Sequence, residues 1–410
     1  IPFIRPRLAV KEGDRVAVGD LLFTDKANPR IRFLSPGGGQ VEAIQYGPRR
    51  VLREVVIRRD TADEPVKSLG PAVHLEEIDV YPRSDLVEHL LAGGVWPLLR
   101  AFPYRGIADP DQEPPAIFVS LDAREPFHVP PERYLATQRA LFALGLKALK
   151  RLCPTVYVHA DATQRPFCDA HKDIITHAVR GRYPADDSGV LLFHVRQSPE
   201  ENKAWFINGQ DLLLVAKLLQ SGQYPTARLF AVAGTGAATP RYVESRLGAP
   251  LKHLVGEVRC QAPRYTVGGA LRGYAGNPEG HVGLYETSVT VLPEPVSADF
   301  LTLFRPGFDK PSYSRAFLSA MRRAPLPMTT NVNGGHRACI ACGYCADVCP
   351  VDIWPQMTFK SILAEEVEES LAHGLLDCVE CGLCSYVCPS KIELAATLQA
   401  AKHAYRKEQA

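Results

Sequence analysis

The stretch Cys339-Ile-Ala-Cys342-Gly-Tyr-Cys345-Ala-Asp-Val-Cys349-Pro350 sets the fold of the C-terminal part of this 410-residue chain. The same spacing recurs as Cys378-Val-Glu-Cys381-Gly-Leu-Cys384-Ser-Tyr-Val-Cys388-Pro389. Each run has the form C-x2-C-x2-C-x3-C-P, with which a protein holds a 4Fe-4S cluster. Gly343 and Gly382 permit the sharp turn that wraps three thiolates round one corner of a cube and leaves backbone N–H groups facing its sulfides.

The ligands of the two clusters are expected to cross between the runs. The fourth cysteine of each run opens the following segment and cannot reach the cube that the first three hold. We therefore expect one 4Fe-4S cluster on Cys339, Cys342, Cys345 and Cys388, and a second on Cys378, Cys381, Cys384 and Cys349. Two zinc sites are the alternative, but zinc takes four ligands from two CxxC knuckles, whereas each run here also offers a third and a fourth thiolate.

The segment between the two runs is longer than a minimal ferredoxin needs. Its pattern predicts a helix over 359–372, and a second helix is predicted over 393–405. Residues 301–410 are therefore predicted to form an α-helical ferredoxin domain. The three cysteines outside the runs are expected to be small buried hydrophobic residues; they are Cys153, Cys168 and Cys260.

Composition and charge exclude several function classes. Hydrophobic residues make up 46% and charged residues 22%, as in a globular protein with real cores. The formal net charge is only +2, so we expect neither nucleic acid nor an anionic membrane surface as partner. No apolar run reaches the ~18 residues of a spanning helix, and no signal peptide is found, so clustered thiols predict a reducing, cytoplasmic location. Because the chain begins at Ile1 inside a predicted domain, we expect that a preceding piece is missing.

Three further domains are predicted ahead of the cysteine runs, in a multidomain α/β and α+β protein. Residues 1–60 alternate apolar and polar side chains between glycines, which predicts a hammerhead β module like that of biotinyl and lipoyl carriers, without a modified lysine at Lys26. Residues 61–255 alternate strands and helices, as in a Rossmann-like domain. Strands are predicted over 117–120, 155–160, 190–195 and 228–233, and helices over 85–100, 131–152, 210–219 and 241–247. Residues 256–300 return to short strands, as in a β-grasp module of the SLBB type.

One glycine-containing loop could hold a dinucleotide. Gly234-Thr-Gly236-Ala-Ala-Thr239 follows a predicted strand and precedes a predicted helix, but it lacks the third glycine of the fingerprint. A plain turn is therefore favoured over NAD binding at this position.

Segments along nearly the whole chain resemble the NqrA subunits of the Na+-translocating NADH:quinone oxidoreductases. They are residues 6–16, 25–29, 49–57, 205–211, 246–249, 288–294, 305–310 and 331–335. The resemblance implies a peripheral subunit on the inner face of the cell membrane, which docks on an integral-membrane subunit of a redox complex and has quinone as a candidate ligand. Familiar members of that family lack most of the cysteines found here. The two runs instead resemble the end of the RnfC protein of the Rnf complex, whose glycine-rich flavin loop is absent from this chain, so FMN is not expected.

Together these features predict electron transfer through two 4Fe-4S clusters, in an ion-translocating NADH:quinone oxidoreductase-type complex. The chain is expected to act with a redox partner protein rather than alone, and no catalytic side chain is assigned, because the chemistry belongs to the clusters and partner subunits. A quinone-binding scaffold with purely structural clusters, and a subunit of an Rnf-type ferredoxin:NAD oxidoreductase, are the alternatives.

Overall fold

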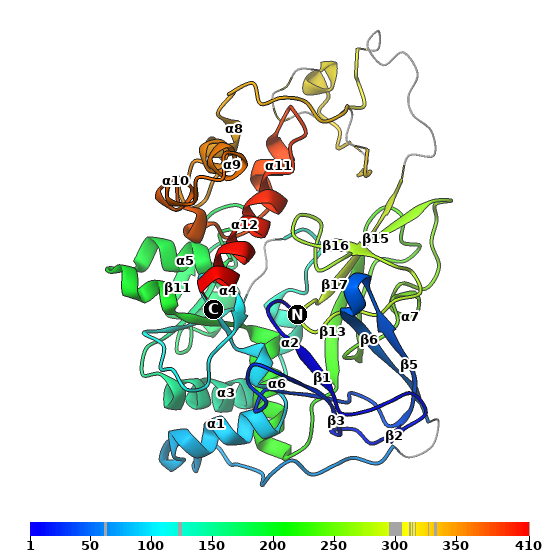
Figure 1. Ribbon diagram of the computed structural model, residues 1–410, viewed down its shortest axis with the longest axis vertical. Coiled ribbons are helices and arrows are strands. Elements are labelled where there is room, and N and C mark those ends of the chain that lie inside the picture. The colour runs from blue at the N-terminus through cyan, green and yellow to red at the C-terminus, as the bar shows by residue number, and fades with distance from the viewer. Residues whose placement is uncertain are drawn as a thin grey trace.

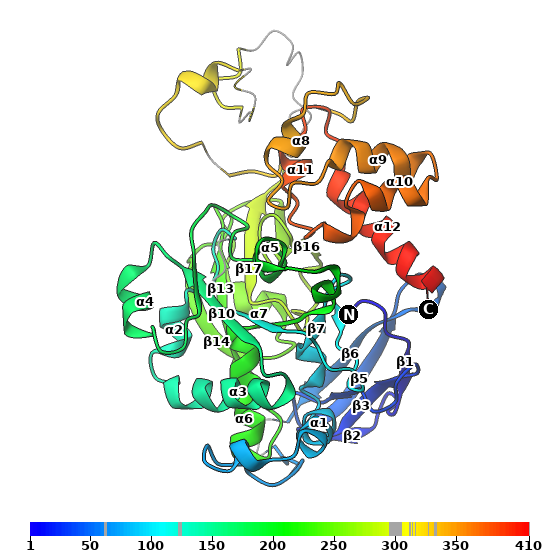
Figure 2. The same ribbon diagram turned by 90° about the vertical axis from the view of Figure 1, so that its left-hand side faces the viewer.

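The computed structural model describes residues 1–60, 64–121, 125–294, 306–310, 313, 315, 317–326, 328–331 and 334–409. Within them the chain forms four β-sheets, with a C-terminal group of helices stacked on one end (Figures 1 and 2). The two ends of the chain meet, since the ring of Phe3 lies 4.6 Å from that of His403 and 3.9 Å from the guanidinium of Arg406. No helix in this described part is long and apolar enough to cross a bilayer.

The N-terminal module consists of two small antiparallel sheets. One contains β1 (Pro6–Leu8), β3 (Leu21–Asp25) and β4 (Arg32–Leu34), and the other contains β2 (Arg15–Val16), β5 (Gly39–Tyr46) and β6 (Leu52–Arg59). Val16, Leu22 and Val41 fill a small core, which explains the alternation seen in the sequence.

The central sheet has six strands in the order β11-β10-β9-β12-β7-β8. The strands are β7 (Arg100–Ala101), β8 (Gly106–Ile107), β9 (Ile117–Ser120), β10 (Val156–Asp161), β11 (His177–Val179) and β12 (Trp205–Asn208). Strands β9 to β12 run parallel, whereas β7 and β8 are antiparallel to their neighbours. The helices of this unit are α1 (Arg83–Ala92), α2 (Pro131–Leu135), α3 (Arg139–Leu152), α4 (Arg165–Ala170), α5 (Ser188–Val195) and α6 (Gly209–Ser221).

Both faces of this sheet are covered. Ile117 and Ile207 share a core with α1, α3 and α6 on one face, whereas Phe118 and Phe206 pack with Leu191 of α5 on the other. This two-sided burial accounts for the continuous apolar run of β9.

A third unit is a five-stranded sheet with the order β14-β13-β17-β15-β16. Its strands are β13 (Ala227–Ala233), β14 (Arg241–Arg246), β15 (Pro263–Val267), β16 (Tyr274–Gly276) and β17 (Ser288–Pro293), with α7 (Leu251–Val255) against one face. β13 and β14 lie within the predicted 61–255 domain, but they pair with each other and β13 pairs with the later strand β17, so the two larger sheets part between α6 and β13. The predicted boundary at residue 300 lies outside the described residues.

Two predicted elements were of the wrong type, and the helix predicted over 85–100 ends at Ala92. The expected strand over 190–195 is the body of α5, whose first turn is capped by the Asp187 carboxylate accepting from the Gly189 N–H. The expected helix over 241–247 is β14, paired along its length with β13. Short apolar runs do not separate helix from strand, and the pairing that holds β14 is set outside its own sequence.

The C-terminal part is helical, as predicted, but in shorter pieces. It contains α8 (Tyr344–Asp347), α9 (Pro355–Leu363), α10 (Val367–Ala372), α11 (Leu383–Val387) and α12 (Leu394–Gln409). The single helix expected over 359–372 is divided between α9 and α10, where Glu365 has φ +60° and ends the helical path.

Candidate iron–sulfur sites and adjoining cavity

The two cysteine loops have the same backbone geometry. Ala341 and Gly343 have φ +54° and +82° in the first loop, and Glu380 and Gly382 have φ +56° and +80° in the second. In each loop the glycine stands directly before a short helix, α8 or α11. The left-handed residues turn the chain back on itself, so that the three cysteines of a run surround one space.

Two cavities in the helical part are lined by cysteines from both runs. Cys339, Cys342, Cys345 and Cys388 line the first. Cys349, Cys378, Cys381 and Cys384 line the second, where Cys345 also forms part of the wall. The structure thus brings together the two sets that we expected from the spacing; which thiolates bind iron stays a prediction.

The chemistry of these donors fits iron–sulfur clusters. Among the described residues no three Cys, His, Asp or Glu side chains lie close enough to share one metal ion; the four thiols instead stand round each cavity. Burial raises the pKa of Cys378, Cys381 and Cys384, so these thiols are protonated in the metal-free chain. Iron binds the thiolate, and cluster assembly therefore releases their protons.

The two sites differ in their access to solvent. Cys339 and Cys342 are exposed, and Ile340 between them is 67% exposed, so the first site opens to the surface. Cys381 is buried, and the second site lies between the helices and the rest of the molecule.

Three contacts fix the second loop. The buried Lys402 of α12 donates to the carbonyl oxygen of Cys378 at 2.8 Å. The Tyr183 hydroxyl donates to the carbonyl oxygen of Cys381 at 2.6 Å. Gly382 packs so closely on the turn between β15 and β16 that an added Cβ would lie 2.5 Å from the carbonyl oxygen of Leu271.

A cavity of about 740 Å3 lies directly beneath this loop. Val379, Glu380 and Gly382 line both this cavity and the second cysteine site. Its floor is formed where β9 and β12 end, at Ser120 and Asn208. The cavity is thus shared by the central sheet, the five-stranded sheet and the helical part.

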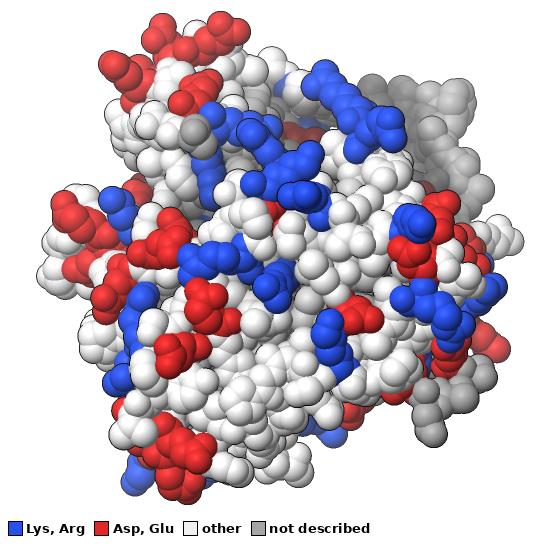
Figure 3. All heavy atoms as spheres, turned by 60° about the horizontal axis from the view of Figure 1, so that its bottom comes forward, with Lys and Arg blue, Asp and Glu red and all other residues white. Residues whose placement is uncertain are grey.

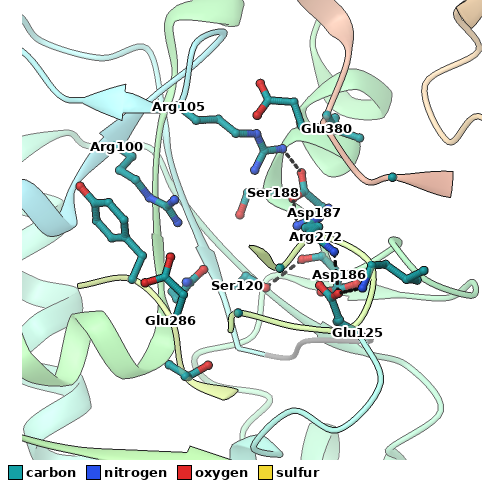
Figure 4. A pocket seen from close by; sticks show the side chains of 18 of the residues that line it. Arg100, Arg105, Ser120, Glu125, Asp186, Asp187, Ser188, Arg272, Glu286 and Glu380 are labelled. Atoms are coloured by element: carbon teal, nitrogen blue, oxygen red, sulfur yellow. Dashed lines mark hydrogen bonds and ion pairs between the residues drawn. The ribbon is translucent and has the colours of Figure 1, made fainter. Parts of the chain in front are cut away.

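Asp187 is the centre of a charge network on one side of this cavity (Figure 4). Its two carboxylate oxygens accept from Arg105 and Arg272, each at 2.7 Å. Burial alone would raise the pKa of Asp187, but the two guanidinium groups hold it below its ordinary value. The neighbouring Glu125 is different: burial raises its pKa, although it accepts from the backbone N–H groups of Leu271 and Arg272.

Arg100 lies on the other side of the cavity (Figure 4). Its guanidinium carbon lies 4.4 Å from the ring centre of Phe206 and 4.5 Å from that of Tyr285. It forms no ion pair with any described carboxylate, and its buried Nε has no hydrogen-bond partner. Burial lowers the pKa of Arg100, as expected for a cation without a counter-ion.

Sequence reasoning missed this cavity because its residues come from separate short segments with no shared spacing. The glycine-containing loop 234–239 follows β13 but leads into strand β14 rather than a helix, which removes the context of a dinucleotide fingerprint.

Family models match three parts of the chain. Residues 1–60 match the NqrA N-terminal barrel-sandwich hybrid domain, residues 81–224 the NqrA second alpha/beta domain, and residues 338–392 a 4Fe-4S dicluster domain. The NqrA subunit of the Na+-translocating NADH-quinone reductase of Pseudomonas aeruginosa is 32% identical over 377 residues, which is 91% of this chain and 84% of that protein. The chain belongs to the NqrA family. The NqrA protein of Klebsiella pneumoniae is similar to the same degree, with 32% identity over 379 residues and the same two coverages.

One solved structure with a partial likeness is an NAD+-reducing [NiFe]-hydrogenase in the air-oxidized state. It is 16% identical, with a TM-score of 0.38 over 54% of this chain and 49% of that chain. The family assignment rests on the NqrA relatives, and the dicluster match covers the region of the two cysteine runs.

Proposed function

We propose that this NqrA family member carries single electrons through two 4Fe-4S clusters, as a peripheral subunit of a membrane-bound, Na+-translocating NADH:quinone oxidoreductase-type complex. The observation that supports this most is the lining of the two cavities. Each cavity is lined by the first three cysteines of one run and by the fourth cysteine of the other run. In this proposal Cys339, Cys342, Cys345 and Cys388 hold the first cluster, and Cys349, Cys378, Cys381 and Cys384 hold the second.

The arrangement of the two sites suits an electron route. Cys345 belongs to the walls of both cavities, so the two clusters would be close neighbours. The first site opens to solvent beside Ile340, where a redox partner protein can approach. Each electron that passes oxidises one cluster and reduces the next, and the chain contributes by holding the cysteines and by excluding water from the inner site.

The proposal extends to the place of the chain in the complex. The chain docks from the cytoplasmic side on an integral-membrane subunit, without inserting into the bilayer itself. Acidic and basic side chains are interspersed on the face shown in Figure 3, in keeping with a net charge of +2. This mixture favours a specific protein interface over general adhesion to anionic lipid. The Rossmann-like and β-grasp assignments belong to the same proposal, with the boundary between them moved from residue 255 to between α6 and β13, and so does the α-helical ferredoxin assignment of residues 301–410.

Metal analysis of anaerobically purified chain tests the cluster content. We expect about eight iron and about eight sulfide per chain, as two cubanes require. Stoichiometric zinc without iron would contradict it. A Cys260→Ser variant is the matched control, because Cys260 lies outside both cavities and its loss should leave the iron content unchanged.

Reduction during turnover separates electron transfer from a structural role for the clusters. When the chain is purified with its partner subunits and mixed with NADH, EPR should show reduced clusters within the turnover time. If dithionite reduces the clusters but turnover with NADH never reduces them, the scaffold alternative would be supported. Reduction by ferredoxin alone, with no response to quinone, would support an Rnf-type complex.

A further inference from the structure

The 740 Å3 cavity beneath the second cysteine loop has the features of a ligand site that no relative's name assigns. We propose that it binds a nucleotide, that is, a flat conjugated ring carrying a phosphate, with Arg100 and the N-terminus of α6 holding the phosphate. Binding itself does not depend on the clusters; only its effect on their spectra rests on the proposed function.

The position of the cavity in the fold is the first argument. In the order β11-β10-β9-β12-β7-β8, the chain proceeds from β9 to β10 on one side, whereas β12 lies on the other side of β9. The order therefore reverses between β9 and β12, and the cavity lies where these two parallel strands end, at Ser120 and Asn208. Open α/β sheets bind their ligands at such a reversal, outside the carboxyl ends of the strands. A volume of 740 Å3 lies within the range of small-molecule sites.

Arg100 is the second argument, because it is a cation that forms no ion pair with any carboxylate of the described residues. It lies on β7 next to Phe206 of β12 and is held between the rings of Phe206 and Tyr285. Glu286 stands on the same side of the cavity but forms no ion pair with it (Figure 4). A shielded guanidinium without a partner is unfavourable, and an anionic ligand would remove that cost through charge-assisted hydrogen bonds.

The N-terminus of α6 faces the same space. Asn208, Gly209 and Gln210 line the cavity, and among the described residues no side chain caps this 13-residue helix. Uncapped N–H groups at the start of a helix attract phosphate. Arg100 pairs with Phe206 of β12, which leads directly into α6, and both the arginine and the start of the helix line this one cavity, so one phosphate can reach both. The chain lacks a glycine-rich phosphate loop, and these groups would take its place.

The walls suit a flat ring. Five phenylalanine and tyrosine side chains line the cavity: Tyr104, Tyr134, Phe206, Tyr274 and Tyr285. Aromatic faces stack on conjugated rings. A site for phosphate alone would not need such walls. A ring between them would lie under Val379, Glu380 and Gly382 and hence beside the second cluster site.

Calorimetric titration of the full chain with FMN, NAD+, AMP and inorganic phosphate, each in turn, tests the proposal. We expect at least one of the three nucleotides to bind saturably at one per chain, and Arg100→Gln to weaken it at least tenfold. Arg100→Lys, which keeps the charge, should recover part of the affinity. Arg139→Gln is the matched control, because Arg139 pairs with Asp173 on the surface, away from the cavity. Unchanged melting temperatures would show that the variants fold.

Several outcomes would overturn the proposal. These are no binding by any of the three nucleotides, binding of phosphate alone, or nucleotide binding that Arg100→Gln leaves within twofold of the unchanged chain. In chain with reconstituted clusters, the nucleotide should also change the EPR signal of the second cluster, and Arg100→Gln should abolish that change. A chain that binds nucleotide but assembles no cluster would refute the proposed function and leave this inference standing. A chain with two reducible clusters and no nucleotide site would refute this inference and leave the proposed function standing.

Discussion

The ammonium nitrogen of Lys402 lies 2.8 Å from the carbonyl oxygen of Cys378, on a side chain that is only 1% exposed. The same nitrogen forms a 2.9 Å ion pair with Glu380, one residue before Cys381. Burial alone would raise the pKa of Glu380, but Lys402 and Arg105 lower it, so the Glu380 carboxylate is ionised. A buried cation and a buried anion thus stand on the same loop, and both act on the charge of the second cluster site.

Removing either partner should shift the reduction potential of the second cluster, in opposite directions. The reduced cluster is the more negative state, so Lys402→Met should lower its potential and Glu380→Gln should raise it. A one-electron equilibrium changes tenfold for about 59 mV, and we expect shifts on the order of 50 mV in an EPR-monitored redox titration. Lys407→Gln, an exposed position on the same helix, should have no effect. Shifts of the same sign in both variants would show that loop distortion, not charge, is responsible.

Crossed ligation predicts which cluster a single substitution damages. Cys349 belongs to the first run in sequence but lines the cavity of Cys378, Cys381 and Cys384. Cys349→Ser should therefore reduce the iron content from about eight to about four per chain and remove the EPR signal of the second cluster. Loss of the signal of the cluster beside it in sequence would show that the ligands do not cross.

The sequence predicted the site residues best where they lie within a few residues of one another in the chain. Cysteine spacing and the glycines 343 and 382 belong to loops a few residues long, so the two cysteine sets follow from the spacing alone. β14 was mistaken for a helix because its partner β13 is held in place by a third strand, β17. The residue pattern of β14 itself does not indicate that it pairs with β13.

The residues of the cavity likewise could not be grouped from the sequence. Arg100, Arg105, Asp187 and Arg272 come from a short strand, two turns and a helix cap, up to 172 residues apart by their numbers. They meet only because the central sheet, the five-stranded sheet and the cysteine loop close on one space. A single sequence without this arrangement offers no reason to group them.

A buried histidine predicts an acid-sensitive central sheet. His159 of β10 is 1% exposed, and burial lowers its pKa to about 4 from 6.5. The unfolded chain therefore takes up a proton between pH 6.5 and 4 that the folded chain does not bind. Stability is complete above pH 6.5 and falls as the pH decreases toward 4, by roughly 2 kcal/mol between pH 7 and pH 5 from this group alone.

His159→Gln should flatten this pH dependence. Urea unfolding can be followed by tryptophan fluorescence, because Trp96 and Trp205 are packed together in the core beside this sheet, with ring centres 5.7 Å apart. His253→Gln, at an exposed position on α7, is the control. If the loss of stability between pH 7 and pH 5 were the same in both variants, His159 would not be its source.

Two glycines form a matched pair that isolates the contact between the second cysteine loop and the β15–β16 turn. Gly343 and Gly382 have nearly the same φ, +82° and +80°, so alanine should cost about 1–2 kcal/mol at either from backbone strain. Among the described residues the new Cβ would clash only at Gly382, where it would lie 2.5 Å from the carbonyl oxygen of Leu271; at Gly343 it would meet no described atom within 4 Å.

Gly382→Ala should therefore be the more damaging change, by about 1–3 kcal/mol, because the loop must shift away from the turn. Thermal melts should show the difference in stability, and timed iron release to a chelator should show the second cluster leaving first in Gly382→Ala. The melt of Gly343→Ala supplies the cost of the left-handed backbone alone, so the difference between the variants measures the packing contact. Equal melting temperatures and equal release rates would mean that the helical part does not rest on the five-stranded sheet in solution, and the cavity between them would then be open on that side.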